Sequence, residues 1–310
     1  MEEEQCAVRI NKLEERVVKL IQEEKELEDQ LQLIDHLQQL GVAYHFKDDI
    51  KDALGSIHGS LEDKSMLLKH NLHATALLFR LLRENGFDVS EGGSSFLHSR
   101  FKDGKGHLKA CLQHQTKGML SLYEASYLEK EGELVLSQAM DFTTKHLKKL
   151  MEQGSLEPPL REQVASALEL PLHWRMHRLH ARWDINAIDK FPEYMKMCFL
   201  AVFNLANNAA YRIMKEKNAE LQRGDVAKAL QCCMHERDVS ESAAREHVGD
   251  LIRANWRALN GNHPSNCFTT VASNTPLVSQ FMYGNGDGYG IPDGETKNQV
   301  MALLIEPIMF

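Results

Sequence analysis

The spacing of apolar residues constrains the fold of this chain more than any other feature. Near the N-terminus they recur every three or four positions, which places them along one face of a helix. A short, interrupted seam of this kind favours a helix that faces the core of a globular array over a coiled coil, which the pattern alone would also permit. The series is broken at Glu24 and consists of Ile10, Leu13, Val17, Leu20, Leu27, Leu31 and Ile34.

The same helical periodicity recurs along the chain, whereas sustained β alternation is absent from the sequence. Gly-rich or Pro-marked breaks such as "ENGFDVSEGGSS", "EQGSLEPP" and "NGNHPSN" separate the periodic segments. We therefore expect an all-α protein. Its further helical segments are expected around 65–84, 105–130, 133–151, 160–182, 192–216 and 240–259.

Composition narrows the class of protein. A net charge of −8 argues against a nucleic-acid-binding surface, and no apolar run approaches the roughly 18 residues that span a bilayer. Six cysteines without a paired framework favour a reducing compartment. The acidic, amphipathic start is unlike a signal or transit peptide, so we expect no membrane association and a cytoplasmic location for a chain made as shown.

Four blocks in the first part of the chain carry a resemblance to a known family. They are "LIDHLQQLGVAYHFKDDIKDAL" from Leu33, "LHATALLFRLLRENGFDVS" from Leu72, "KGMLSLYEASYLEKEGE" from Lys117 and "ALELPLHWRMHRLHARW" from Ala167. Together they resemble the N-terminal helical domain of plant class I terpene synthases, most closely the angiosperm monoterpene and isoprene synthase group. The resemblance implies a helical α/α barrel over 1–182.

The second part of the chain resembles the C-terminal class I domain of the same family. The blocks are "RWDINAIDKFPEYMKMCFLAVFN" from Arg182, the segment beginning "ELQRGDVAKALQCCMHERDVS" at Glu220, and "FMYGNGDGYGIPDGETKNQVMALLIEPI" from Phe281. The resemblance implies a partial catalytic domain over 183–310. In the family this domain binds a prenyl diphosphate through Mg²⁺ held by a D-D-x-x-D element and by an N/D-D-x-x-S/T-x-x-x-E element. Mg²⁺ takes oxygen ligands and would neutralise the leaving diphosphate.

Against the family pattern, two internal segments are missing from this chain. One apparent deletion lies at 183/184, where the helices that carry D-D-x-x-D would stand, and the other lies near 218/219. Glu220 matches the last ligand of the second element, whereas Glu216 and Arg212 occupy the two earlier ligand positions. Glu220 is therefore the expected metal ligand, for Mg²⁺ or Mn²⁺, with Glu216 and Asp225 as weaker candidates.

The Gly-rich stretch "GNGDGYG" at 284–290 is not preceded by a strand pattern, so it is no dinucleotide-binding loop. In the family this stretch forms a loop that closes over the active site, which implies that Tyr283 and Asp287 border the pocket. A turn-rich linker is the alternative. Trp256, Phe268, Phe281 and Met282 are candidates to line a cavity, although helical spacing of this kind is more often plain core.

Three further patterns resemble sites, and each has a simpler structural interpretation. "DDIKD" at Asp48–Asp52 fits D-D-x-x-D, but it lies within the N-terminal block, where we expect a solvated acidic face. His173, His177 and His180 share one helix face without a familiar metal signature. Cys232 and Cys233 are adjacent, lack the two-residue spacer of a zinc or redox pair, and are expected to pack as small apolar residues.

Two functional hypotheses follow from the resemblance. The first is a terpene synthase that ionises a prenyl diphosphate, geranyl diphosphate before others, and then cyclises or deprotonates the cation. The alternative is a catalytically inactive, truncated or splice-variant member that lacks D-D-x-x-D. The family places its monoterpene members in the plastid. A monomer or non-specific association is expected, because missing helices would leave apolar faces uncovered.

Overall fold

A computed structural model describes residues 2–61, 64, 68, 71–89, 115–175, 233–234 and 237–261, with the backbone alone for 2–11. This part of the chain is helical throughout and contains no strand, as expected for an all-α protein. None of its helices is long and apolar enough to span a membrane. The elements are α1 (Glu2–Glu23), α2 (Leu27–Gln39), η1 (Ala43–Phe46), α3 (Lys47–Gly59), α5 (Leu72–Glu84), α7 (Thr116–Ser126), α8 (Leu134–Gln153), α9 (Pro158–Glu169), η3 (Leu172–Trp174) and α13 (Glu241–Asn260).

The break in the first apolar series separates two helices. α1 ends at Glu23 and α2 begins at Leu27. Between them, the Glu24 carboxylate accepts hydrogen bonds from the backbone N–H groups of Lys25 and Glu26, at 2.9 and 3.2 Å. Within the predicted series, Val17, Leu31 and Ile34 are fully buried, whereas Leu13, Leu20 and Leu27 are half-buried. The interpretation as a core-facing segment is confirmed, but the segment forms two helices where the sequence predicted a single helix face.

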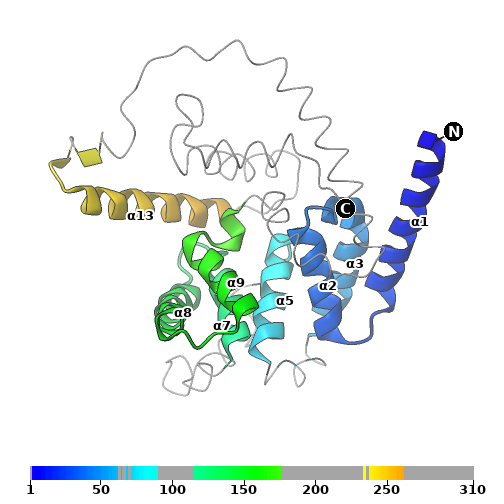
Figure 1. Cartoon of the computed structure of the whole chain (residues 1–310), viewed down its shortest axis with the longest axis horizontal. Coiled ribbons are helices and arrows are strands. Elements are labelled where there is room, and N and C mark those ends of the chain that lie inside the picture. Colours follow the sequence, from blue (N-terminus) through cyan, green and yellow to red (C-terminus); the bar gives the residue numbers. More distant parts are fainter. Residues whose placement is uncertain are drawn as a thin grey trace, which may run out of the picture.

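α5 is the central helix of the bundle. In Figure 1 it stands between α2 on one side and α7 on the other, with α1 and α3 beyond α2 and α8 beyond α7. Eleven of its 13 residues are buried, which is typical of a helix that is surrounded by others. One continuous core of buried side chains runs from Val17 in α1 to Ala167 in α9.

Two of the expected helical segments are interrupted in the structure. Within the segment 160–182, α9 ends at Glu169, because Pro171 has no N–H to donate and holds Leu170 in an extended conformation. The segment 65–84 is interrupted at Asn71, whose side chain accepts the N–H of Ala74 and caps α5.

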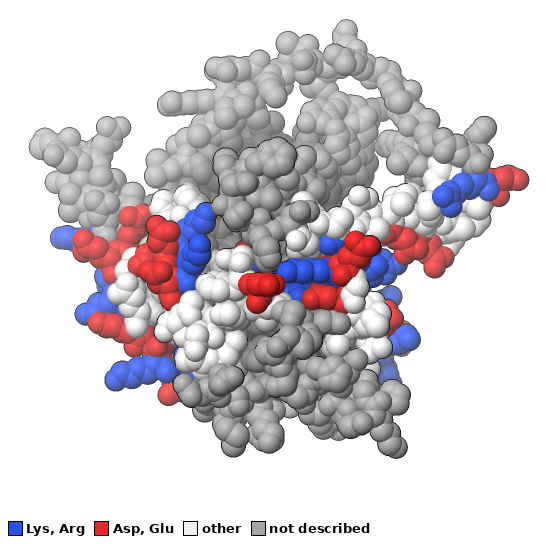
Figure 2. All heavy atoms as spheres, turned by 180° about the vertical axis from the view of Figure 1, so that it is seen from behind, with Lys and Arg blue, Asp and Glu red and all other residues white. Residues whose placement is uncertain are grey.

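The remaining expected segments agree with the described helices or fall outside them. The segments 133–151 and 240–259 correspond to α8 and α13, and within 105–130 the structure places α7. The segment 192–216 and the boundary at 182/183 lie outside the described residues, so the division into 1–182 and 183–310 stays a prediction. Figure 2 shows acidic and basic side chains interspersed over the visible face.

Candidate functional site

The predicted ligand and pocket residues lie outside the described residues. These are Glu216, Glu220, Asp225, Tyr283 and Asp287, and the two apparent deletions lie there as well. Their roles therefore stay predictions.

The acidic pattern on α3 is a solvated helix face. Asp48 and Asp52 are exposed, and the half-buried Asp49 accepts a hydrogen bond from Gln22 Nε2 at 3.2 Å. Within the described part of the chain, no three His, Cys, Asp or Glu side chains come together in a way that could hold a metal ion. The interpretation of "DDIKD" as a surface feature is confirmed.

The described residues do contain the contact between α13, from the second half of the chain, and the N-terminal helices. α13 runs along one end of the N-terminal helices (Figure 1). Its last residue, Asn260, donates hydrogen bonds from Nδ2 to the backbone oxygens of Tyr127 and Glu129, both at 3.0 Å. One turn earlier, Arg257 Nε lies 3.1 Å from the Glu129 carboxylate. The C-terminal end of α13 is thus fixed to the end of α7.

Aromatic rings fill the space beside these polar contacts. Trp174 of η3 lies parallel to Trp256 of α13, with ring centroids 6.0 Å apart, and edge-on to Tyr127 at 5.0 Å. His173 Nε2 lies 3.0 Å from Asn260 Oδ1, and its ring lies 5.0 Å from that of Trp256. Trp256 is only 5% exposed. It is therefore buried where α13 meets η3, and His173 has a hydrogen-bond partner in Asn260.

The remaining members of those sequence patterns are not described, apart from one cysteine. Cys233 is half-buried in a helical segment, as expected for a packed thiol. The others are His177, His180, Cys232, Phe268, Phe281 and Met282.

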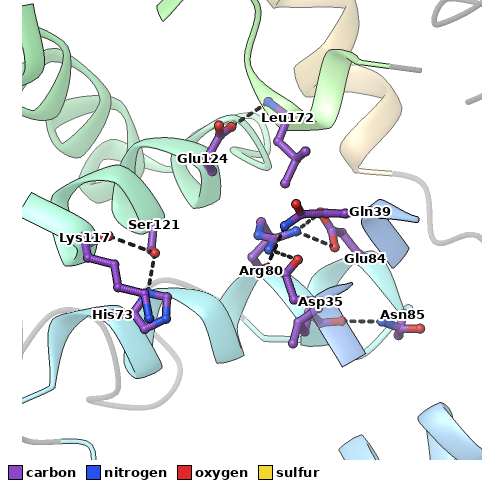
Figure 3. Close-up of polar contacts among 11 residues, drawn as sticks. Asp35, Gln39, His73, Arg80, Glu84, Asn85, Lys117, Ser121, Glu124 and Leu172 are labelled. Carbon is purple, nitrogen blue, oxygen red and sulfur yellow. Dashed lines mark hydrogen bonds and ion pairs between the residues drawn. The ribbon is translucent and has the colours of Figure 1, made fainter. Parts of the chain in front are cut away.

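A buried carboxylate anchors the segment that carries His173 and Trp174. Glu124 of α7 is 8% exposed and accepts the backbone N–H of Leu172 at 2.6 Å (Figure 3). Arg175 Nη2 lies 3.8 Å from its other oxygen. Burial raises the pKa of Glu124 to about 7, against the opposing effects of Arg175 and of the Leu172 N–H.

A second buried charge cluster joins α2 to α5. Arg80 pairs with Asp35 and, at 3.3 Å, with Glu84 (Figure 3). Burial alone would raise the pKa of Asp35, but the Arg80 guanidinium holds it below its ordinary value. Burial would likewise lower the pKa of Arg80, yet its two carboxylates raise it, so the cluster stays ionised.

The polar contact between α5 and α7 contains a neutral imidazole. His73 Nδ1 lies 2.7 Å from Ser121 Oγ (Figure 3). Burial, together with the nearby Lys117, lowers the pKa of His73 to about 4. Ser121 also donates to the Lys117 backbone oxygen at 3.1 Å, a hydrogen bond within α7.

Sequence patterns did not identify the Glu124 anchor or the Asn260 contact. The available signals were Pro171, which ends a helix just before two large aromatic residues, and a charged residue in an otherwise apolar part of α7. Neither signal predicts that Glu124 and Leu172 form a hydrogen bond with each other, because the two residues are 48 positions apart in sequence.

Family models match most of the chain in order. The model described as terpene synthase, N-terminal domain, matches residues 1–168. The model for the terpene synthase family metal-binding domain matches residues 176–220, and that for terpene synthase family 2, C-terminal metal binding, matches residues 217–258.

Two plant relatives and two solved structures show the same likeness. Monoterpene synthase 7, chloroplastic, of Hedychium coronarium is 36% identical, with 99% of this chain and 87% of the relative covered. Monoterpene synthase 8, chloroplastic, of the same plant is 34% identical, with 100% and 88% covered. Isoprene synthase from grey poplar leaves, in complex with three Mg²⁺ ions and dimethylallyl-S-thiolodiphosphate, has a TM-score of 0.73 at 25% identity, with 97% of both chains covered. Limonene synthase with 2-fluorolinalyl diphosphate has a TM-score of 0.75 at 23% identity, with 98% of this chain and 95% of that one covered.

The alignments are longer than the chain. The match to Monoterpene synthase 7 extends over 521 positions, whereas the chain has 310 residues, so at least 211 aligned positions hold a residue of the relative alone. The family match itself rests on both halves of the chain, and the helical fold agrees with it. The chain therefore belongs to the terpene synthase family.

Proposed function

We propose that this protein binds a prenyl diphosphate with a divalent metal ion and acts as a terpene synthase in terpenoid biosynthesis, with geranyl diphosphate as its first candidate substrate. The match of two metal-binding models to residues 176–258 carries this proposal. The relatives at 34–36% identity are named monoterpene synthases, which supports a C10 substrate. A neighbouring structure holds Mg²⁺ and a diphosphate analogue, which supports the ligand class.

The candidate donors fit a hard cation in chemistry but form an incomplete set. Glu220, with Glu216 and Asp225 beside it in sequence, would supply carboxylate oxygens to Mg²⁺ or Mn²⁺. Arg212 does not fit, because a cationic side chain stands where the family pattern places the oxygen ligand of an Asn or Asp. When bound, the metal would neutralise the leaving diphosphate. Tyr283 and Asp287 would border the pocket from the loop at 284–290.

A second candidate function is supported by the length of the alignments. At least 211 positions of the relative have no counterpart in this chain, and the D-D-x-x-D element is among the expected losses. Removing even one preorganised charge-stabilising group lowers the rate of an enzyme by roughly 10²–10³-fold. A non-catalytic member of the family, derived from a truncated or spliced gene, is therefore the alternative. The names of the relatives support a plastid location for either form.

Product formation separates the two candidates. Purified full chain is incubated with geranyl diphosphate and Mg²⁺, with and without a chelator, and volatiles are identified by gas chromatography–mass spectrometry. Glu220→Gln tests the metal ligand, and Asp48→Asn, on the exposed face of α3, is its matched control. Metal-dependent product that Glu220→Gln abolishes and Asp48→Asn leaves intact supports catalysis. Soluble, helical protein without product supports the inactive form.

A further inference from the structure

We propose that Glu124 is a positioning residue for a proton-sensitive clamp, residues 170–175, which holds the C-terminal end of α13 on the N-terminal helices and releases it when Glu124 ionises. The inference goes beyond the proposed function, because it concerns the docking of α13 and is independent of catalysis.

On one side, the clamp is fastened to α7 through Glu124. Glu124 Oε2 accepts the Leu172 N–H at 2.6 Å, and its Oε1 faces Arg175 Nη2 at 3.8 Å. Arg175 in turn donates from Nε to the backbone oxygen of Leu170 at 2.5 Å. The carboxyl group thus contacts the middle and the last residue of a short, proline-containing segment, and Arg175 in turn holds its first residue.

On the other side, the clamp contacts α13. His173 reaches Asn260, and Trp174 stacks on Trp256. Asn260 completes the connection by donating to the Tyr127 backbone oxygen at 3.0 Å, three residues after Glu124 and directly after the end of α7. A change at Glu124 therefore reaches α13 through Leu172, His173 and Trp174 within a few residues.

The charges around Glu124 oppose one another. Arg175, after η3, and Arg80, from α5, favour its ionised form, whereas Asp35, from α2, disfavours it. The adjacent phenols of Tyr123 and Tyr127 stay neutral, because burial raises both of their pKa values. Burial of Glu124 outweighs the two arginines, and its pKa in the clamped state is about 7.

The direction of the response follows from proton binding. In the clamped state the pKa of Glu124 is about 7, and a released, solvated glutamate has the ordinary value of 4.5. Between these values the clamped state holds the proton and the released state does not, so clamping is favoured at low pH and weakens as pH rises through 7. Linkage of one proton predicts that the opening constant increases about tenfold between pH 6 and pH 8.

Tryptophan accessibility in the full chain tests the clamp. The protein has three tryptophans, so Trp183→Phe leaves Trp174 and Trp256 as the fluorophores. Acrylamide quenching is measured from pH 6 to pH 8, with far-UV circular dichroism as a check that the helices persist. We expect quenching to increase with pH in the parent. We expect it to stay low and constant in Glu124→Gln, whose neutral amide can still accept the Leu172 N–H.

Two further variants make the test specific. Glu162→Gln, on an exposed part of α9, should retain the pH dependence of the parent. Asn260→Ala breaks the α13 side of the clamp and should raise quenching at every pH, which provides a readout even if Glu124→Gln fails to fold. His173 is retained in Glu124→Gln, so equal pH dependence in that variant and the parent would assign the titration elsewhere and overturn the proposal. A flat parent profile would overturn the proton sensitivity whatever Asn260→Ala shows, and unchanged quenching in Asn260→Ala would overturn the role of the clamp in holding α13.

Discussion

The close approach of Gly118 in α7 to Leu72 in α5 predicts that a glycine-to-alanine change inside a helix, which usually stabilises, will here be destabilising. Gly118 is a buried residue in the first turn of α7. A Cβ atom placed there would lie 2.8 Å from Leu72 Cβ and Cγ and 2.9 Å from Leu72 Cδ2. Carbon atoms in favourable contact are about 3.5–4.0 Å apart, so an added methyl group overlaps Leu72 by roughly an ångström. Leu72 has little room to move, because it is the first residue of α5 and its N–H is bonded to Gln115.

Two opposing effects set the magnitude for Gly118→Ala. Alanine in place of glycine within a helix stabilises by about 0.5–1 kcal/mol, and by less in a first turn. Overpacking a filled core destabilises by about 1–3 kcal/mol. The net expectation is a loss of about 1–2 kcal/mol of the free energy of unfolding. Gly55→Ala in α3 is the matched control, because its methyl would meet only Phe87 at an ordinary 3.8 Å.

Urea denaturation followed by circular dichroism at 222 nm measures both variants. We expect the midpoint to fall for Gly118→Ala and to rise for Gly55→Ala, with similar dependence on urea concentration. Leu72→Ala removes two of the three overlapping atoms, so its combination with Gly118→Ala should be more stable than the sum of the single changes predicts. Equal stabilisation by Gly118→Ala and Gly55→Ala would refute the inferred close approach of the two helices.

Three other predictions concern buried polar groups. Arg83 donates to two backbone oxygens and pairs with Glu133, so Arg83→Met should lower the free energy of unfolding by about 3–5 kcal/mol in urea denaturation; a loss below 1 kcal/mol would contradict its role. Asn71→Ala removes the cap that accepts the Ala74 N–H and should cost about 1 kcal/mol in the same assay, whereas an unchanged midpoint would exclude a capping role. The pKa of His73 lies below that of the unfolded chain, so the stability present above pH 6.5 should fall as pH drops toward 4; His73→Gln should reduce this fall, and an unaltered pH profile in the variant would assign it to other groups.

Sequence reasoning succeeded where the deciding information is local. The apolar series indicated a core-facing helical segment, because its periodicity lies within a few residues. The interruption at Glu24 marked the place where the structure divides this segment into two helices, although the sequence analysis expected a single one. The signals for the helix end before Pro171 and for the cap at Asn71 were also local. The segments predicted from periodicity alone nevertheless extended past both positions. The contact of Glu124 with Leu172 was beyond this kind of reasoning, since it depends on how α7 and η3 pack. The candidate ligands came from family resemblance, which identifies residues but supplies no geometry.

Docking of α13 and the proposed catalysis depend on different residues of this chain. The buried core from Val17 to Ala167 closes within the N-terminal helices, and α13 is attached to it by a small set of aromatic and polar contacts around Trp256 and Asn260. The described partners in these contacts are Tyr127, Glu129, His173 and Trp174, all from the first part of the chain. A chain that has lost its metal ligands can therefore keep α13 in place, and a pH-dependent change in tryptophan quenching is expected from an inactive protein as much as from an active one. Product formation without a working clamp would show the reverse, namely that the metal site tolerates movement of α13.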